Sequence, residues 1–227
     1  MLFRSLECEK RGIRLIHIWE NEWDDTLKQE IIKTRLSSII GGNPEFKSIY
    51  ARNCYVKDLD PNEASEFVSL HHLQGSIRAS IRMGLFTKAD DHLVAVMTFG
   101  KPRFNKSCQW ELLRYCSNGR VVGGASKLLR HFEGIYKPLS LISYADRSWS
   151  TLIKPNLYER LGFKLQYQSM PNYKYLKDTE VLSRYQCQKH KLAELLGPDN
   201  FNPEISETEN MLSNGYVKMY DVEIWYM

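Results

Sequence analysis

The sequence predicts an α/β fold built on a mixed sheet, and three observations lead to that prediction. Between residues 48 and 178, stretches rich in β-branched and aromatic residues alternate with stretches of helical periodicity. Taken in order, these stretches give the pattern β-α-β-β-β-α-β-α-β-β. Two of the expected helices also begin with start signals, at Asp60 and at Gly123. Alternation of this kind is typical of helices packed on a sheet that includes parallel strands.

The first half of this region predicts a strand, a helix and a hairpin. Residues 48–59 predict a strand, and Asp60-Pro61-Asn62-Glu63 predicts a helix start with proline in its first turn. That helix is expected to end near residues 71–72. Residues 76–87 and 91–101 predict a hairpin joined by a short polar turn.

The second half predicts strands and helices that alternate. Residues 108–116 predict a strand that leads into the glycine-opened helix. Residues 139–146 are mostly apolar, which is typical of a strand buried on both faces. A helical turn at 156–163 and strands at 164–169 and 172–177 are expected to follow.

The chain divides into three segments: 1–44, a central domain over 48–178, and a C-terminal extension over 179–227. In the first segment, residues 13–19 predict a strand, an acidic turn follows, and a helix then ends at Gly41-Gly42-Asn43-Pro44. One strand and one helix cannot bury their apolar faces alone, so this segment is expected to pack on another part of the chain. The extension predicts a polar helix over 181–196, a loop rich in Pro and Asn, and a final strand.

Composition and charge bound the possible functions. Hydrophobic residues make up 43% of the chain, charged residues 26%, and no apolar run approaches the length of a membrane span. Five cysteines without a C-x-x-C pair favour free thiols in a reducing cytoplasm over disulfides or zinc. Residues 51–180 carry 19 Lys and Arg against 12 Asp and Glu, a net charge of +7. Such an excess suits a polyanionic partner, although solubility alone is the alternative interpretation.

Two motifs resemble the signatures of the GNAT acyltransferases. Residues 120–125, RVVGGA, share the first arginine, the first glycine and the final small residue of one signature. Residues 158–163, YERLGF, match a second signature, Tyr-x-x-x-Gly-Phe. The resemblance implies a GNAT-like fold with short N- and C-terminal extensions, and acetyl-CoA or a related acyl-CoA bound at the start of the glycine-opened helix. The residues expected to bind this cofactor are Arg120, Val122, Gly123, Gly124, Ala125, Ser126 and Lys127. Without the resemblance, the glycines are equally explained by a tight turn that leads into the helix.

A closer resemblance covers roughly residues 50–178. The stretches HLQG (72–75), WELLRYC (110–116) and SYADRSWS (143–150) are similar to a group of phage GNAT-like proteins related to the DNA-modification protein Mom. This resemblance implies an enzyme that modifies adenine bases of double-stranded phage DNA in the host cytoplasm and protects that DNA from restriction. The catalytic residues that it implies are His72, Arg114, Asp146 and Tyr158.

Each of these residues also has a structural interpretation. Asp146, at the end of a buried strand, is expected to act as the general base, with a turn residue as the alternative. Arg114 is expected to orient Asp146 or to form an ion pair with it. His72 holds the base, moves the proton, or only caps a helix. Tyr158 is a general acid by resemblance, or a core residue.

Two further features complete the sequence-based hypotheses. Trp110 and Trp149 are candidates for stacking an extruded base, with packing as the alternative. Residues 12–23, GIRLIHIWENEW, resemble the tail of a Vsr-like nuclease domain that occurs fused to such units in phage homing endonucleases. We therefore expect residues 1–44 to be a remnant without nuclease activity, and its acidic residues 20–25 to form a solvated turn, not a metal site. The alternatives to a DNA-modifying enzyme are a non-catalytic DNA-binding remnant and a conventional N-acetyltransferase.

Overall fold

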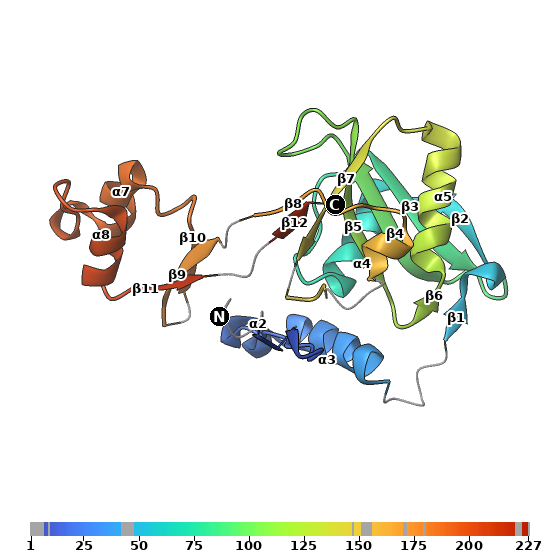
Figure 1. Cartoon of the computed structure of the whole chain (residues 1–227), viewed down its shortest axis with the longest axis horizontal. Helices are drawn as coiled ribbons and strands as arrows, with labels where there is room; N and C mark the ends of the chain where they lie inside the picture. The colour runs from blue at the N-terminus through green and yellow to red at the C-terminus, as the bar shows by residue number, and fades with distance from the viewer. Residues whose placement is uncertain are drawn as a thin grey trace. The chain divides into compact units, whose positions relative to one another are not determined.

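The computed structural model describes residues 7–8, 10–41, 48–146, 148–150, 156–169, 172–178, 180–220 and 224–226. The chain forms two compact units (Figure 1). The larger unit is built mainly from residues 18–145 and 156–166, and the smaller unit mainly from residues 167–220.

The larger unit contains a five-stranded mixed sheet, which confirms the predicted α/β class (Figure 1). Its strand order is β2-β3-β4-β5-β7. The first four strands pair antiparallel with their neighbours, and β7 runs parallel to β5. The strands are β2 (Cys54–Asp58), β3 (Ile81–Thr87), β4 (Leu93–Gly100), β5 (Trp110–Ser117) and β7 (Leu141–Asp146).

Two helices, α4 (Pro61–His71) and α5 (Gly124–Tyr136), pack on opposite faces of this sheet. Successive residues of a strand point to opposite faces. Val96 of β4 therefore joins the apolar cluster under α4, whereas the next residue, Met97, joins the larger cluster under α5. The start of α4 is as predicted, because the Asp60 side chain accepts hydrogen bonds from two backbone N–H groups of its first turn.

Shorter elements connect these parts. Strand β1 (Ile49–Tyr50) pairs parallel with β6 (Val121–Val122), and a 3-10 turn, η1 (Ala51–Asn53), separates β1 from β2. The strand predicted over 48–59 is thus interrupted. Helix α6 (Leu157–Arg160) is the helical turn that the sequence predicted.

The N-terminal segment differs in part from its prediction. Helix α3 (Thr26–Ile40) forms as expected and ends at Gly41, whose φ of 75° is left-handed. The predicted acidic turn is instead a short helix, α2 (Glu20–Asp24). The strand predicted at 13–19 is wrong, since these residues form neither helix nor strand. An apolar run becomes a strand only where a neighbour supplies hydrogen bonds, and within the described ranges no strand pairs with it.

The smaller unit has its own antiparallel sheet with the strand order β10-β9-β11. The predicted strand at 172–177 exists as β9, and its partners come from the C-terminal segment. The polar helix predicted over 181–196 is wrong, because this stretch begins as β10 and only its end is helical. The elements from 167 onward are β8 (Tyr167–Gln168), β9 (Tyr173–Lys177), β10 (Glu180–Ser183), η2 (Lys189–Lys191), α7 (Leu192–Leu196), η3 (Pro198–Asn200), α8 (Glu207–Ser213), β11 (Val217–Tyr220) and β12 (Ile224–Tyr226).

Three general properties complete the description. None of the described helices combines the length and the apolar character needed to cross a membrane. In the same part of the chain, His, Cys, Asp and Glu side chains form no group able to hold a metal ion. The five cysteines are free thiols.

Candidate functional site

Strand β5 departs from both of its neighbours near its middle. Its pairing with β4 joins Thr98 to Arg114 and Phe99 to Leu112, which leaves Leu113 as an extra residue in β5. Its parallel pairing with β7 covers three residue pairs and ends at Leu112 within the described residues, although both strands continue. A β-bulge bends its strand, and bulges are frequent beside active sites. The two strands therefore stop pairing directly before Arg114.

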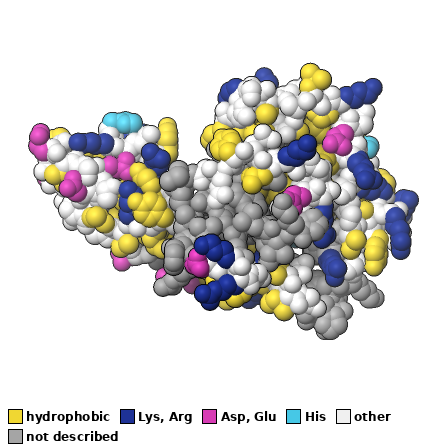
Figure 2. Space-filling model, in the orientation of Figure 1, with side chains coloured by type: hydrophobic (Ala, Val, Ile, Leu, Met, Phe, Trp, Pro, Cys, Tyr) yellow, Lys and Arg dark blue, Asp and Glu magenta, His cyan; other side chains and the backbone are white. Residues whose placement is uncertain are grey.

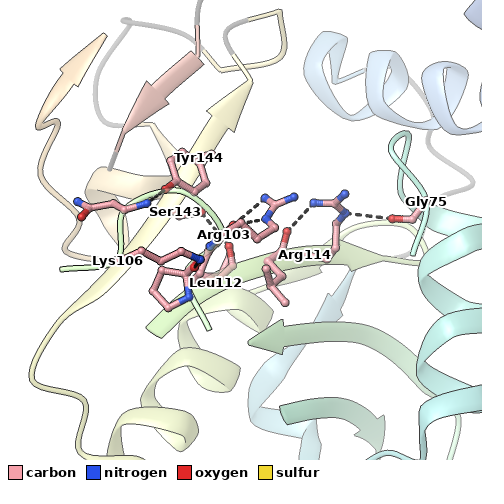
Figure 3. A network of polar contacts seen from close by, with 11 residues as sticks. Gly75, Arg103, Lys106, Leu112, Arg114, Ser143 and Tyr144 are labelled. Carbon is pink, nitrogen blue, oxygen red and sulfur yellow. Dashed lines mark hydrogen bonds and ion pairs between the residues drawn. The ribbon is translucent and has the colours of Figure 1, made fainter. Parts of the chain in front are cut away.

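The guanidinium of Arg114 is buried and hydrogen-bonds only to neutral groups in the described part of the chain. Its Nε donates to the carbonyl of Gly75 at 3.0 Å, and its Nη1 donates to the carbonyl of Leu113 at 2.8 Å (Figure 3). Burial lowers the pKa of Arg114, and the nearby charge of Arg103 adds to this, whereas Glu111 acts in the opposite direction. A buried guanidinium without a bonded carboxylate is costly, which makes Arg114 a candidate ligand-binding group.

His72 caps the last turn of α4 with its backbone and lies beside Arg114. Its Nδ1 accepts a hydrogen bond from the backbone N–H of Gln74 at 3.2 Å. Burial lowers the pKa of His72 to about 3, and the charges of Arg114 and Arg35 contribute further. The ring is therefore neutral near pH 7 and carries its proton on Nε2. In this form the Nε2–H of His72 is a hydrogen-bond donor, which favours a role in holding a ligand over one in moving a proton.

Tyr158 lies near Arg114, since it is one of the groups that raise the pKa of that arginine. The sequence around it explains its position. Asn156 caps helix α6, and Gly162, with a φ of 89°, turns the chain after it. The structure thus gathers three of the predicted residues, His72, Arg114 and Tyr158, in the larger unit.

Arg35 was not among the predicted site residues. It comes from α3, in the N-terminal segment, and its charge acts on both His72 and Cys116. No local motif marks it, because its proximity depends on how α3 packs against α4. The larger unit therefore places at least two arginines, Arg35 and Arg114, around a neutral histidine.

Asp146 is the last residue of β7 and belongs to the smaller unit. Its Oδ1 accepts hydrogen bonds from the backbone N–H of Ser148 at 2.8 Å and from the Ser148 hydroxyl at 2.7 Å. These bonds form a turn directly after the strand, as the structural interpretation expected. The catalytic role of Asp146 stays a prediction.

The glycines at the start of α5 each have a structural reason. Gly123 adopts a left-handed conformation with a φ of 76°, which favours glycine. At Gly124, an added Cβ would lie 2.8 Å from Cγ1 of Val121 and 3.2 Å from the hydroxyl of Tyr115. Gly124 is therefore needed for close packing, and the tight-turn interpretation accounts for Gly123.

The backbone donors at the start of α5 are only partly used. No side chain caps the helix, and its first turn holds no acidic residue. The backbone of Ala125 hydrogen-bonds the hydroxyl of Tyr115, whose pKa burial raises to about 12. Lys127 donates from Nζ to the carbonyls of Ala51 at 2.9 Å and Cys54 at 2.5 Å, so its ammonium ties α5 to the β1–β2 region. The other predicted binding residues are exposed at Arg120, Val122 and Gly123, half-buried at Ser126, and buried at Gly124 and Ala125.

The two candidate stacking tryptophans have different surroundings. Trp110 packs edge-on against Phe132 and Tyr136, with ring centroids 5.7 and 5.8 Å apart. It belongs to the apolar core under α5, so the packing interpretation is the right one for Trp110. Trp149 lies in the smaller unit, where its carbonyl accepts a hydrogen bond from Arg14, and its stacking role stays a prediction.

Comparisons with known proteins give no assignment. No protein-family model matches the sequence, and no curated protein matches it. Since a fold alone does not determine an activity, the function has to be argued from the site.

Proposed function

We propose that this chain is a GNAT-like transferase that uses an acyl-CoA-type donor to modify adenine bases of DNA. The observation that supports this best is the break in pairing between β5 and β7 beside Arg114, with α5 beginning after the carboxyl end of β5. In sheets with parallel strands, ligands bind at the carboxyl ends of the strands. A donor bound there would have its reactive end beside His72, Arg114 and Tyr158.

The start of α5 is suited to hold the pyrophosphate of the donor. Its first turn lacks a side-chain cap and an acidic residue, so backbone N–H groups and the helix dipole are available to an anion. Gly123 is exposed, and among the described residues a Cβ there would meet only Ala51, at 3.6 Å, which leaves room for a ligand. Arg120 is exposed, lies three residues before Gly123 in the sequence, and supplies a cation. An acyl-CoA bound in this way would provide an activated acyl group.

Acyl transfer to adenine requires the removal of a proton from its N6 amine. The N6 amine of adenine is a weak nucleophile because its lone pair is delocalised into the ring. A positioned base that takes the proton as the bond forms is worth about 10²–10⁴-fold in rate. Asp146 is our candidate for this base, the Nε2–H of His72 would hold the acceptor, and the hydroxyl of Tyr158 would protonate the departing thiolate.

Charge supports DNA as the acceptor. Residues 51–180 carry a net charge of +7, and Figure 2 shows Lys and Arg side chains gathered on the side of the larger unit where Figure 1 places α5 and β2. Contacts between such residues and phosphates release counterions, so the affinity for duplex DNA should fall steeply with salt. Modified adenine in phage DNA would then resist restriction in the host cytoplasm.

Mass spectrometry of nucleosides tests the proposal. DNA from cells that express the chain should contain an adenine derivative of increased mass. The variant Arg114→Lys should abolish it, because a lysine cannot reproduce both carbonyl hydrogen bonds and still bind a ligand. Arg130→Lys, at an exposed position on α5, is the matched control and should retain modification.

Two results would replace the proposal with one of its alternatives. Unmodified DNA together with acyl transfer to small amines by the purified chain would indicate a conventional N-acetyltransferase. The absence of CoA binding in calorimetry, together with salt-dependent DNA binding, would indicate a non-catalytic DNA-binding protein.

A further inference from the structure

The loop between β4 and β5, residues 101–109, presents an exposed aromatic ring among cations. Phe104 is 69% exposed, and Lys101, Arg103 and Lys106 lie within two or three residues of it. Single exposed apolar side chains are common on protein surfaces, so the meaning of this ring depends on the groups around it.

Phe104 lies in a loop that is fixed by contacts with β7 and within the loop itself. Its ring packs edge-on against Tyr144 of β7, with centroids 5.4 Å apart. The hydroxyl of Tyr144 accepts a hydrogen bond from the backbone N–H of Asn105 at 3.2 Å, and Lys106 donates to the carbonyl of Pro102 at 2.6 Å. These contacts hold the ring in place before a ligand arrives, so little entropy is lost when it binds.

The guanidinium of Arg103 lies over this ring, 5.5 Å from its centroid, and a second guanidinium lies close to it. Arg103 and Arg114 extend toward one another from the loop and from β5 (Figure 3). One carboxylate, that of Glu111, bonds Arg103, whereas Arg114 bonds only carbonyls among the described residues. The hydroxyl of Thr98, which lies opposite Arg114 in the sheet, is buried and without a hydrogen-bond partner in the same part of the chain. The pair of arginines thus carries one positive charge in excess, beside an unused polar group.

We propose that Arg103 and Arg114 together bind a phosphate of a single-stranded or extruded nucleic-acid segment, and that Phe104 stacks on a neighbouring base. The inference rests on the proposed function, since it assigns the place where the acceptor strand binds. Arginine binds phosphate through paired N–H groups, and Arg103 is one-third exposed, which gives a ligand access to the pair. An aromatic ring beside a cationic groove is the arrangement that single-stranded nucleic acids use. A small carboxylate ligand would bind the two arginines but would make no contact that explains the ring of Phe104.

Fluorescence anisotropy with a short labelled single-stranded deoxyoligonucleotide tests this inference on the full chain. Phe104→Ala should weaken binding by roughly 5-fold to 150-fold, the range that one stacked base contributes. Tyr185→Ala is the matched control, because Tyr185 is 71% exposed and has the Lys191 ammonium 3.2 Å from its ring centroid. That variant should bind like the parent chain.

The salt dependence of binding distinguishes the contribution of stacking on Phe104 from that of the charge on Arg114. Phe104→Ala should leave the slope of log K against log salt unchanged, because stacking releases no counterions. Arg114→Gln should reduce the slope by about 0.7, the contribution of one phosphate contact on a single strand. Circular dichroism of each variant checks that it is folded, and if Arg114→Gln is unfolded, Phe104→Ala alone decides.

The outcomes distinguish this site from the proposed function. Unchanged affinity in Phe104→Ala, or equal losses in Phe104→Ala and Tyr185→Ala, would overturn the inference even if cellular DNA is modified. A specific loss in Phe104→Ala supports the site even if no modified adenine is found, and the transferase proposal would then fail alone.

Discussion

The carboxylate of Glu111 binds Arg103 at three points. Its Oε1 accepts from Nε at 2.8 Å and from Nη2 at 2.6 Å, and its Oε2 accepts from the backbone N–H of Arg103 at 2.7 Å. The Glu111 side chain is fully buried, whereas that of Arg103 is 33% exposed. Among the described residues the buried carboxylate forms its ion pair with Arg103, and this pair fixes the loop carrying Phe104.

Removal of Arg103 should be costly for this reason. Arg103→Ala leaves a buried carboxylate without its cation, and we expect a loss of about 3–5 kcal/mol in the free energy of unfolding. Adding Glu111→Gln to this variant should recover part of the loss, because a neutral amide is cheaper to bury. Urea unfolding of the single and double variants measures the coupling. Strictly additive effects would show that the two residues do not depend on each other.

The neutral ring of His72 predicts that the free energy of unfolding depends on pH. In the folded protein its pKa is lowered from 6.5 to about 3, so between these values the unfolded chain binds a proton that the folded chain does not. This contribution to stability is complete above pH 6.5 and decreases as the pH falls toward 3. His72→Asn keeps an acceptor for the N–H of Gln74 and removes the titration, so the parent chain should lose more stability than the variant on acidification.

NMR of the His72 ring gives a direct check. The resonances should remain those of the neutral form with the proton on Nε2 throughout the upper part of this window. A ring that titrates near 6.5 would contradict the buried, arginine-flanked environment.

Substitution of Gly123 or Gly124 by alanine should lower the stability of the protein through two different mechanisms. In Gly124→Ala the new Cβ collides with Val121, so Val121→Ala in the same chain should restore most of the lost stability. In Gly123→Ala the cost is that of a left-handed backbone, about 1–2 kcal/mol, and Val121→Ala should not relieve it. Thermal unfolding of the two single glycine variants, their combinations with Val121→Ala, Val121→Ala alone and the parent separates the two mechanisms. Equal rescue of both glycine variants would contradict this assignment.

Local signals explain which parts of the fold were predictable. Asp60 and Gly41 mark helix ends through their own side chain or backbone, so α4 and α3 could be located from the sequence. Residues 13–19 and 181–196 have apolar or helical patterns too, but their structure depends on whether residues outside the stretch pair with them. For β10 the partner is β9, and periodicity within one stretch carries no record of such pairing.

The distinction between local signals and contacts with other elements also applies to the candidate site. His72 and Arg114 were found because short motifs surround them. Arg35 and Arg103 were missed, since the first acts through the packing of α3 and the second through the buried Glu111. One signal was present in the sequence: an acidic residue stands at position 111 in a mostly apolar strand, and a buried carboxylate requires a cation nearby.

Asp146 offers the sharpest test of catalysis, because its structural and chemical roles can be separated. Asp146→Asn retains an oxygen that can accept both hydrogen bonds from Ser148, and it removes the charge needed in a general base. Ser148→Ala removes the hydroxyl and keeps the carboxylate. If Asp146 is the base, Asp146→Asn should fold with parental stability and lose DNA modification by at least about 10²-fold, whereas Ser148→Ala should lose a few tenths to about 1 kcal/mol of stability and keep most of its activity. Nucleoside mass spectrometry and urea unfolding of both variants give the comparison. Full modification by Asp146→Asn would leave Asp146 as a turn residue only, and the search for the base would move to the groups of the larger unit around Arg114.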